Sequence, residues 1–413
     1  MNPRQAALAW AVLSQLLPAT AGIAAEVSYQ PEYLDAEDPL LIDIEESLDY
    51  PYKRPGRFSF DGDLRGGYFD TEVDARDGSR DDSDEYRLRF RYGANYSFSE
   101  QFRIRGRLAA SCSDSDCDPS VDIARTPSQG SDIEGGELVV DEFYFGYEQG
   151  PLALVLGRQQ TRSLTRGGVF ATDLSRLTSP NMTVNWTDGL SLLYRSSGGW
   201  LSELITQYND EDGSSTLARS PLDFHDDDSR LSYFYSLENR EPWGVFTQRG
   251  FDITWMPSAL LVDGSRAGQL EDYWALVGRL AAELPIGSGY PSIVVAGQIG
   301  YAPETPREET VATGSGGDVG GLAWHLDASW MNFFPRHSLG LNYGVTDAGW
   351  LLSSSYRPNE ETLTLRYHWR PLPHTQLEIQ ARWREERDKL VGSLRKRDTF
   401  DWRLRLTWVL PPP

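Results

Sequence analysis

Arginines stand at every second position of two neighbouring segments of the chain. They are Arg87, Arg89, Arg91, Arg103, Arg105 and Arg107. A guanidinium group stays charged at physiological pH and binds carboxylate or phosphate through a fork of N–H groups. Successive side chains of a β-strand point to opposite faces, so each trio would line one face of a strand. Such a row predicts a path of many weak anion sites in place of one tight site.

The residues between the first three arginines are apolar or aromatic: Tyr86, Leu88, Phe90 and Tyr92. One face of this segment is therefore oily and the other is basic. A strand of a soluble sandwich can show the same alternation. Its repetition along the chain without a helical period instead predicts a transmembrane β-barrel, in which alternate residues face lipid and lumen.

The turn Ser99-Glu100-Gln101 joins the two arginine segments. Placing Phe98 opposite Phe102 sets Ser97 opposite Arg103, Asn95 opposite Arg105 and Gly93 opposite Arg107. Arg91 then lies one step beyond Arg107, and the two trios are predicted to form one ladder.

Further inward arginines are predicted on the C-terminal strands, at Arg366, Arg370, Arg382, Arg384, Arg403 and Arg405. Closing the barrel sets the last strand beside the first and brings both groups onto one wall. Like charges so close need water, acids or a passing anion to screen them. An alternative is that the arginines pair with Asp61, Asp63, Glu85, Glu378 and Asp401, or with an inserted acidic loop.

Turn clusters divide the chain into about sixteen strands of membrane-crossing length, with 14 or 18 also possible. They fall near 57–69, 85–98, 102–111, 137–148, 152–160, 185–195, 200–209, 229–238, 244–255, 271–284, 291–302, 321–333, 337–345, 361–370, 375–385 and 398–409. Short connections alternate with long ones such as 70–84. The pattern predicts an all-β fold, a single closed antiparallel transmembrane β-barrel over residues 57–410, with short periplasmic turns and long extracellular loops.

The N-terminus predicts a signal peptide over residues 1–25. Arg4 precedes an apolar run from Ala6 to Leu17, and small residues allow cleavage after Ala24 or Ala25. A buried N-terminal helix is the alternative. Residues 26–56 are acidic and are predicted to form a periplasmic extension. No later run is long and apolar enough for a transmembrane helix, and the mean hydropathy of -0.47 suits a barrel.

The net charge of -22 comes largely from acidic loops and the N-terminal segment, so it says little about the strands. The two cysteines, Cys112 and Cys117, are predicted to form a disulfide in an extracellular loop. Binding of a metal by the two thiols and nearby aspartates is the alternative. No metal, other cofactor or nucleic acid is expected.

The motifs Leu154-Val-Leu-Gly-Arg-Gln-Gln160, Arg166-Gly-Gly and Trp186-Thr-Asp-Gly-Leu190 resemble the alginate-export type of outer-membrane barrel. The resemblance implies an electropositive pore for an acidic polysaccharide. It also implies that Arg158, Arg162 and Arg166 line the pore mouth. Alternatively, these three arginines hold the long third loop by salt bridges.

Three function classes are compatible with this sequence: a passive channel, an envelope enzyme and a structural or adhesive barrel. His325, Asp327 and Ser329 share one strand face, but neighbours on a face lie about 7 Å apart, too far for a catalytic relay. We therefore expect no enzyme. The interpretation is a channel of the bacterial outer membrane for hydrophilic, anionic solutes or acidic polysaccharide. The expected partners are membrane lipid, lipopolysaccharide and the barrel-assembly machinery.

Overall fold

The computed structural model describes residues 56–114, 117, 120–121, 137–160, 165–172, 174–175, 186–210, 220–264, 270–286, 291–353 and 355–410. The predicted signal peptide and the predicted extension up to residue 55 lie outside these ranges. The chain divides into two units, Met1–Glu46 and Ser47–Pro413, and all described residues belong to the second unit.

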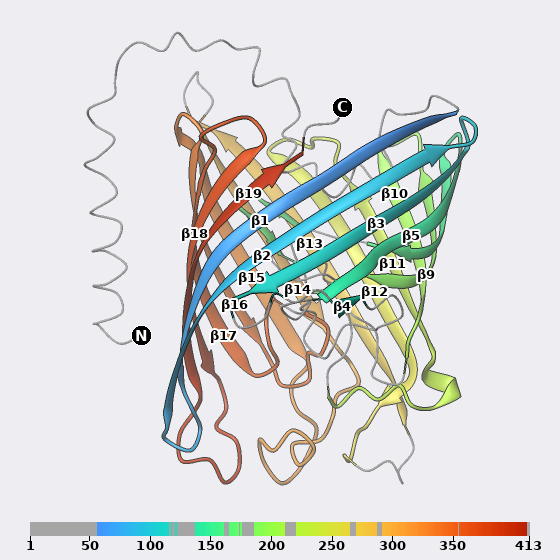
Figure 1. Ribbon diagram of the computed structural model, residues 1–413. Helices are drawn as coiled ribbons and strands as arrows, with labels where there is room; N and C mark the ends of the chain where they lie inside the picture. Colours follow the sequence, from blue (N-terminus) through green and yellow to red (C-terminus); the bar gives the residue numbers. More distant parts are fainter. Residues whose placement is uncertain are drawn as a thin grey trace, which may run out of the picture. The chain divides into compact units, whose positions relative to one another are not determined.

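Sixteen antiparallel strands form a closed barrel in which β1 pairs with both β2 and the last strand, β19 (Figure 1). The strands are β1 (Arg57–Asp74), β2 (Arg80–Ser97), β3 (Phe102–Ser113), β5 (Glu137–Gln149), β6 (Leu152–Gln159), β9 (Thr187–Arg195), β10 (Trp200–Tyr208), β11 (Leu231–Asn239), β12 (Phe246–Leu260), β13 (Glu271–Pro285), β14 (Ser292–Tyr301), β15 (Leu322–Phe334), β16 (His337–Thr346), β17 (Glu360–Trp369), β18 (Thr375–Glu386) and β19 (Asp398–Val409). The predicted fold and strand count are confirmed.

Apolar side chains cover the outside of this barrel. Tyr86, Leu88, Phe90, Leu404 and Leu406, all predicted to face outward, are 40–61% exposed. The residues between them are polar and lie on the inner face, where most of them are buried. This is the reverse of the pattern of a soluble protein and the pattern expected of a barrel whose outer face meets lipid.

Short turns lie at one end of the barrel and longer connections at the other (Figure 1). The backbone NH of Val409 donates to the carbonyl of His374, so β19 ends beside the short turn between β17 and β18. The long loop predicted over residues 70–84 is wrong, because β1 and β2 continue as a hairpin with Asp74 opposite Arg80. Its acidic composition indicated a loop, but Arg80 bonds Glu72 across the strands at 2.5 Å.

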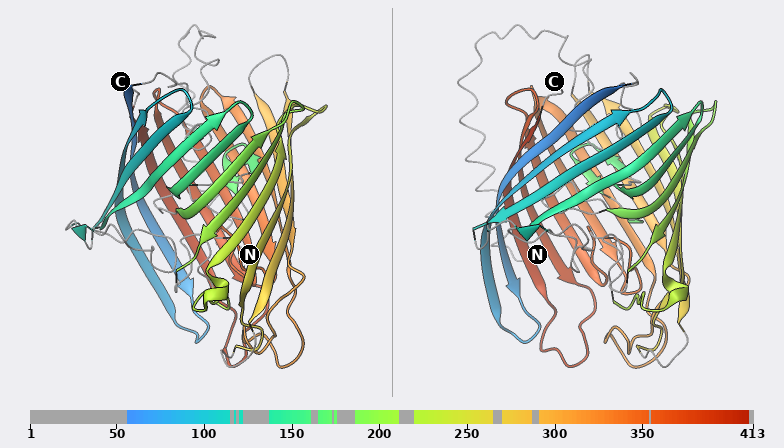
Figure 2. Two further views of the ribbon diagram at one scale, coloured as in Figure 1. Left: turned by 90° about the vertical axis from the view of Figure 1, so that its right-hand side faces the viewer. Right: turned by 45° about the vertical axis from the view of Figure 1, so that its right-hand side comes forward.

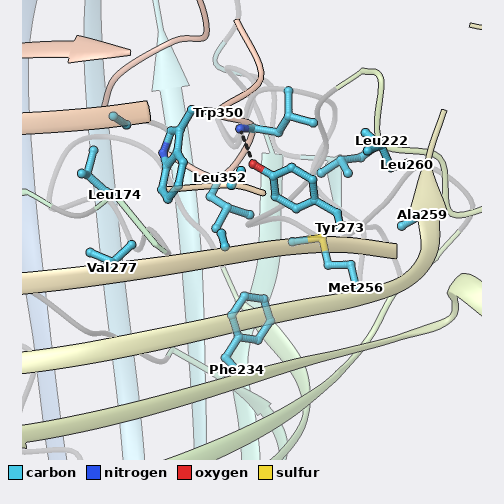
Figure 3. Close-up of a cluster of buried hydrophobic side chains, with 14 of the residues drawn as sticks. Leu174, Leu222, Phe234, Met256, Ala259, Leu260, Tyr273, Val277, Trp350 and Leu352 are labelled. Atoms are coloured by element: carbon cyan, nitrogen blue, oxygen red, sulfur yellow. Dashed lines mark hydrogen bonds between the residues drawn. The ribbon is translucent and has the colours of Figure 1, made fainter. Parts of the chain in front are cut away.

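Several connections fold into the barrel. Residues of the 347–356 connection pack on the inner faces of β10 to β15, where Trp350, Tyr273 and Met256 are fully buried (Figure 3). The Tyr273 hydroxyl accepts the Leu351 NH at 3.0 Å and donates to the Gly349 carbonyl at 3.1 Å. One sector of the barrel interior is therefore a solid apolar core.

Three short strands and a helical turn complete the described elements. They are β4 (Ser120–Val121), β7 (Thr165–Gly167), β8 (Phe170–Thr172) and the 3₁₀ helix η2 (Asp227–Ser229). The β7–β8 hairpin lies inside the ring of strands (Figure 2). Within the described ranges, no helix is long and apolar enough to cross a bilayer.

Candidate functional site

The arginine ladder forms in the predicted register. Ser97 lies opposite Arg103, Asn95 opposite Arg105 and Gly93 opposite Arg107. Gly93 leaves space for its neighbours, because a Cβ there would lie 3.2 Å from Asp61 and 3.3 Å from Arg107. The ladder then continues across β1 to β19.

We call the inward arginines of six adjacent strands the arginine wall. It consists of Arg65, Arg87, Arg89, Arg91, Arg103, Arg105, Arg107, Arg366, Arg382, Arg384, Arg403 and Arg405. Seven carboxylates contact eleven of these arginines: Asp61, Asp63, Glu85, Asp141, Glu142, Glu378 and Asp401. Five of the seven are the acids that the sequence offered as partners. The wall carries more positive than negative charge.

Most of these carboxylates are shared between arginines. Glu378 receives Arg403 Nη2 at 2.9 Å and Arg405 Nη2 at 2.8 Å, and it also contacts His368 Nε2 at 2.9 Å. Asp401 contacts both Arg382, at 2.9 Å, and Arg384, at 3.1 Å. Each pairing lowers the repulsion between neighbouring guanidinium groups without cancelling the excess charge.

A β-bulge supplies two of the acids. Arg107 lies opposite Glu142, but the next residue, Leu108, lies opposite Val140, so Asp141 is the extra residue of β5. A bulge breaks the strict alternation of faces. Asp141 and Glu142 therefore both face inward, and Arg107 Nη2 contacts them at 2.8 Å and 3.1 Å.

The arginines differ in accessibility. The side chains of Arg89 and Arg91 are 0% and 2% exposed, whereas those of Arg87 and Arg382 are 28% and 24% exposed. Arg103 is also partly exposed, and its guanidinium lies 5.9 Å from the Tyr144 ring centre. The buried members hold the wall together, while the more exposed members are available to a solute.

The structure does not bring Arg158 together with the arginine wall. In the strand register Arg158 lies opposite Asp188 and shares the strand face of Leu156, which is 55% exposed on the outside. It bonds Asp188 at 2.9 Å and its guanidinium lies 4.4 Å from the centre of the Trp186 ring.

Three other predicted arginines lie elsewhere. Arg166 belongs to β7, and Arg162 lies outside the described residues. Arg370 follows β17 at the short-turn end, where its backbone NH donates to the Arg336 carbonyl.

The β7–β8 hairpin meets the arginine wall at Arg366. The Arg366 Nη1 donates to the Val169 carbonyl at 3.0 Å, and its guanidinium lies 4.8 Å from the Phe170 ring centre. Gly168, between the two hairpin strands, has φ +71°, a conformation that favours glycine. The Arg166-Gly-Gly motif thus ends β7 and begins the turn of a hairpin inside the barrel.

The opposite side of the barrel carries fewer inward arginines. Arg279 on β13 contacts Asp252 at 2.9 Å and Glu238 at 3.4 Å, and Glu238 also bonds Arg240. Gly250 leaves space for this side chain, because a Cβ there would lie 2.5 Å from Arg279 Nε. Positive charge is therefore concentrated on the arginine wall.

His325, Asp327 and Ser329 bind inserted segments of the chain. The His325 ring stacks on Tyr356, and the Ser329 hydroxyl accepts the Val169 NH at 3.2 Å. His325 Nδ1 and Asp327 Oδ2 are 3.5 Å apart. These contacts give the trio a structural role in holding Tyr356 and the β7–β8 hairpin.

Two further features lie in the connections. Cys112 and Cys117 form a disulfide between β3 and the connection that follows it. In the connection between β16 and β17, partial desolvation lowers the pKa of Arg357 below its usual value, although the nearby Glu360 opposes this shift. Within the described part of the chain, no cluster of three or more His, Cys, Asp or Glu side chains could hold a metal ion.

Sequence reasoning missed Arg65, Asp141 and Glu142. Arg65 Nε lies 3.1 Å from Asp63, and the alternation of Asp61, Asp63 and Arg65 could have indicated that they share a face. For Asp141 and Glu142 the signal is a shift in the alternation of β5. Val139 and Tyr144 are both buried, although one stands at an odd and the other at an even position, so the inward positions change from odd to even between them.

Comparisons with known proteins identify the fold. The chain resembles OprB of Pseudomonas putida (TM-score 0.54, 9% identity, covering 86% of this chain and 94% of that chain). It also resembles the outer membrane channel DcaP of Acinetobacter baumannii (0.55, 11%, 86% and 97%) and OpdO of Pseudomonas aeruginosa (0.53, 13%, 87% and 98%). At such identities the likeness shows the barrel fold alone. No family model matches the sequence, and a comparison with curated proteins finds no match, so the resemblance to the alginate-export type stays a prediction.

Proposed function

We propose that the chain is a channel of the bacterial outer membrane that passes small hydrophilic solutes and prefers anions. Two observations support the membrane and the channel: the apolar outer face of the barrel, and the likeness to barrels that include the outer membrane channel DcaP. The single observation that carries the anion preference is the arginine wall, in which twelve arginines face seven carboxylates.

The sign of the nearest charges decides which ions enter a pore. Many acids of the chain lie in connections, whereas the excess of positive charge on the arginine wall is inside a low-dielectric barrel that focuses its field. Charges more than about 8 Å away are largely screened at physiological salt. The wall therefore outweighs the distant acidic connections for a solute beside it.

Selectivity in a planar bilayer tests this proposal. Under a salt gradient, the reversal potential of the channel is expected to have the sign of anion preference. A triple variant, Arg87→Gln, Arg103→Gln and Arg382→Gln, is expected to shift it toward cations, because these are the more accessible members of the wall. Arg249→Gln is the matched control, since Arg249 stacks on Trp200 and Trp243, away from the wall.

Two outcomes contradict the proposal. Absence of conductance after verified refolding argues for a structural or adhesive barrel. Cation preference in the unaltered protein would show that the arginines stabilise the barrel through ion pairs and do not line a path for anions.

A finer proposal concerns the solute. The alginate-export resemblance of residues 154–190 and the repeated guanidinium sites both suit an acidic polysaccharide, which can bind several arginines at once. An oligosaccharide of uronic acids is expected to block the current at lower concentration than a neutral oligosaccharide of equal length. If the two oligosaccharides block the current equally, the proposal that the solute is an acidic polysaccharide is wrong, and the proposal of a channel for small anions stands.

A further inference from the structure

Three arginines of the described strands stand at positions that face the outside of the barrel. They are Arg80 on β2, Arg158 on β6 and Arg249 on β12. Arg80 bonds Glu72 at 2.5 Å, and Arg158 bonds Asp188 at 2.9 Å. Within the described part of the chain, Arg249 contacts no carboxylate. Its charge on the apolar outer surface therefore differs from the other two in having no counter-charge from the protein.

Arg249 lies between two tryptophans at the short-turn end of the barrel. Its guanidinium carbon is 5.6 Å from the centre of the Trp200 ring and 5.4 Å from that of Trp243. Trp200 follows the short turn between β9 and β10, and Trp243 lies in the turn between β11 and β12. Tryptophans are enriched where the hydrocarbon of a bilayer meets its headgroups. This arrangement therefore places Arg249 at the level of the headgroups.

Stacking on the two rings leaves the hydrogen-bond donors of Arg249 available. Cation–π contacts use the flat faces of a guanidinium, whereas its N–H groups point outward in its plane. Among the described residues, its side-chain acceptor is Asn239, whose Oδ1 lies 3.3 Å from Nη2. An amide oxygen carries no net charge, so the arginine can still bind an anion.

Asn239 holds the site in shape. Its side chain is 1% exposed, and its Nδ2 donates to the Gly198 carbonyl of the neighbouring short turn at 2.9 Å. Its Oδ1 also accepts the Glu241 NH at 2.9 Å. These bonds connect the turns that carry the two tryptophans. A site that is ordered before its ligand arrives loses less side-chain entropy on binding.

The strand register places this charged site beside an apolar surface. One row of opposed residues crosses β10 to β13 and contains Trp200, Asn239, Arg249 and Leu280. Leu280 is 44% exposed, and Phe251, the next outward residue of β12, is 41% exposed. A cation at the edge of an apolar surface is complementary to a molecule with an anionic head and acyl chains.

We propose that Arg249, Trp200 and Trp243 bind the phosphate of a phospholipid, whose acyl chains lie along Phe251 and Leu280. A guanidinium binds phosphate oxygens through two parallel, charge-assisted hydrogen bonds. The short turns are predicted to lie in the periplasm, and the leaflet on that side of an outer membrane consists of phospholipid. The inference rests on the proposed membrane location of the barrel and does not depend on which solute it passes.

Retention of a defined phospholipid by the purified barrel tests this site. The protein is refolded in vesicles of phosphatidylethanolamine and extracted in mild detergent, and the bound lipid is counted by native mass spectrometry. Arg249→Gln is expected to weaken retention about tenfold or more, because a hydrogen bond to a charged group contributes at least that factor. Arg80→Gln is the matched control. It removes an outward arginine that Glu72 already compensates, so retention is expected to stay unchanged.

Trp243→Leu gives a second test that keeps the charge. Trp243 is 64% exposed in a turn, so the barrel is expected to fold without it. Loss of one stacking partner should weaken retention by a smaller factor than loss of the guanidinium. A glycolipid with the same acyl chains and no phosphate should be retained equally by all variants. Far-UV circular dichroism and heat-modifiable gel mobility verify that each barrel has folded.

The outcomes separate the site from the channel. Equal phospholipid retention by Arg249→Gln and the unaltered protein would overturn the inference. Retention of lipopolysaccharide in place of phospholipid, lost in Arg249→Gln, would also overturn it, because the site would then bind the lipid of the other leaflet. Both results leave the channel intact. A folded protein that neither inserts into vesicles nor conducts ions would overturn the proposed function instead.

Discussion

Asp63 of β1 and Arg89 of β2 form a buried ion pair, with Oδ1 and Nη2 2.7 Å apart and both side chains at most 4% exposed. Arg65 and Arg91 also lie within 3.1 Å and 3.9 Å of the same carboxylate. One acid therefore separates three guanidinium groups. Removing one member of a buried charge network leaves the other charges uncompensated. The fold then loses more stability than the ion pair contributes by itself.

Asp63→Asn is expected to lower the free energy of unfolding by about 3 to 5 kcal/mol, because three buried arginines lose their shared carboxylate. The measurement is urea denaturation of the barrel refolded in lipid vesicles, followed by tryptophan fluorescence. Glu85→Gln is the matched control, since its partner Arg87 is 28% exposed and such pairs contribute about 0 to 1 kcal/mol. Equal losses in the two variants would show that burial of the network is not what stabilises the barrel.

The Tyr273 hydroxyl holds the connection between β16 and β17 against the inner face of the barrel. Tyr273→Phe is expected to leave the Leu351 NH and the Gly349 carbonyl unpaired and to destabilise this connection locally by about 1 to 3 kcal/mol. Hydrogen exchange of residues 347–353 should quicken while exchange in the strands stays unchanged. Tyr343→Phe is the control, because Tyr343 bonds the exposed Glu361. Unchanged exchange in Tyr273→Phe would contradict the prediction.

The alternation of side chains was sufficient to predict the barrel and much of the arginine wall. Arg105 and Arg107 lie opposite the residues that the turn at Ser99 predicts, because register in a hairpin follows from turn length. The acids Asp63 and Glu378 also pair as the sequence suggested. These features depend on local period and on charge, and both are readable in a single sequence.

The features that sequence reasoning missed depend on contacts between distant segments. The bulge at Asp141 changes which residues face inward, and a shift of one residue is a weak signal in a strand of mixed composition. The β7–β8 hairpin packs on Gly340 and Ser329, more than 150 positions away in the sequence. Nothing in the period of the hairpin itself indicates that it folds inward.

The disulfide between Cys112 and Cys117 is expected to matter little to the barrel. It closes a short segment, for which chain-entropy estimates give about 2 kcal/mol or less. A double variant, Cys112→Ser and Cys117→Ser, is expected to keep the strand content and the channel conductance. A thiol reagent should find no free cysteine in the unreduced protein. Reactive thiols, or loss of folding in the double variant, would contradict this expectation.

The accessible ion pair of Arg87 and Glu85 allows the source of selectivity to be tested by sign. The two groups lie on the inner face of β2 with Nε and Oε2 2.7 Å apart, and both are about equally exposed, at 28% and 29%. Arg87→Gln and Glu85→Gln break the same pair with similarly small effects on stability. They differ in the charge that stays behind.

If the field of the arginine wall selects the solute, the two variants must shift the reversal potential in opposite directions. Arg87→Gln removes a positive charge and is expected to weaken anion preference, while Glu85→Gln leaves Arg87 uncompensated and strengthens it. Both shifts should shrink at high salt, where a charge acts over about 3 Å at 1 M. Shifts of the same sign would mean that the ion pair affects conduction by holding β2 in shape, so the wall would act as a brace and not as a path for anions.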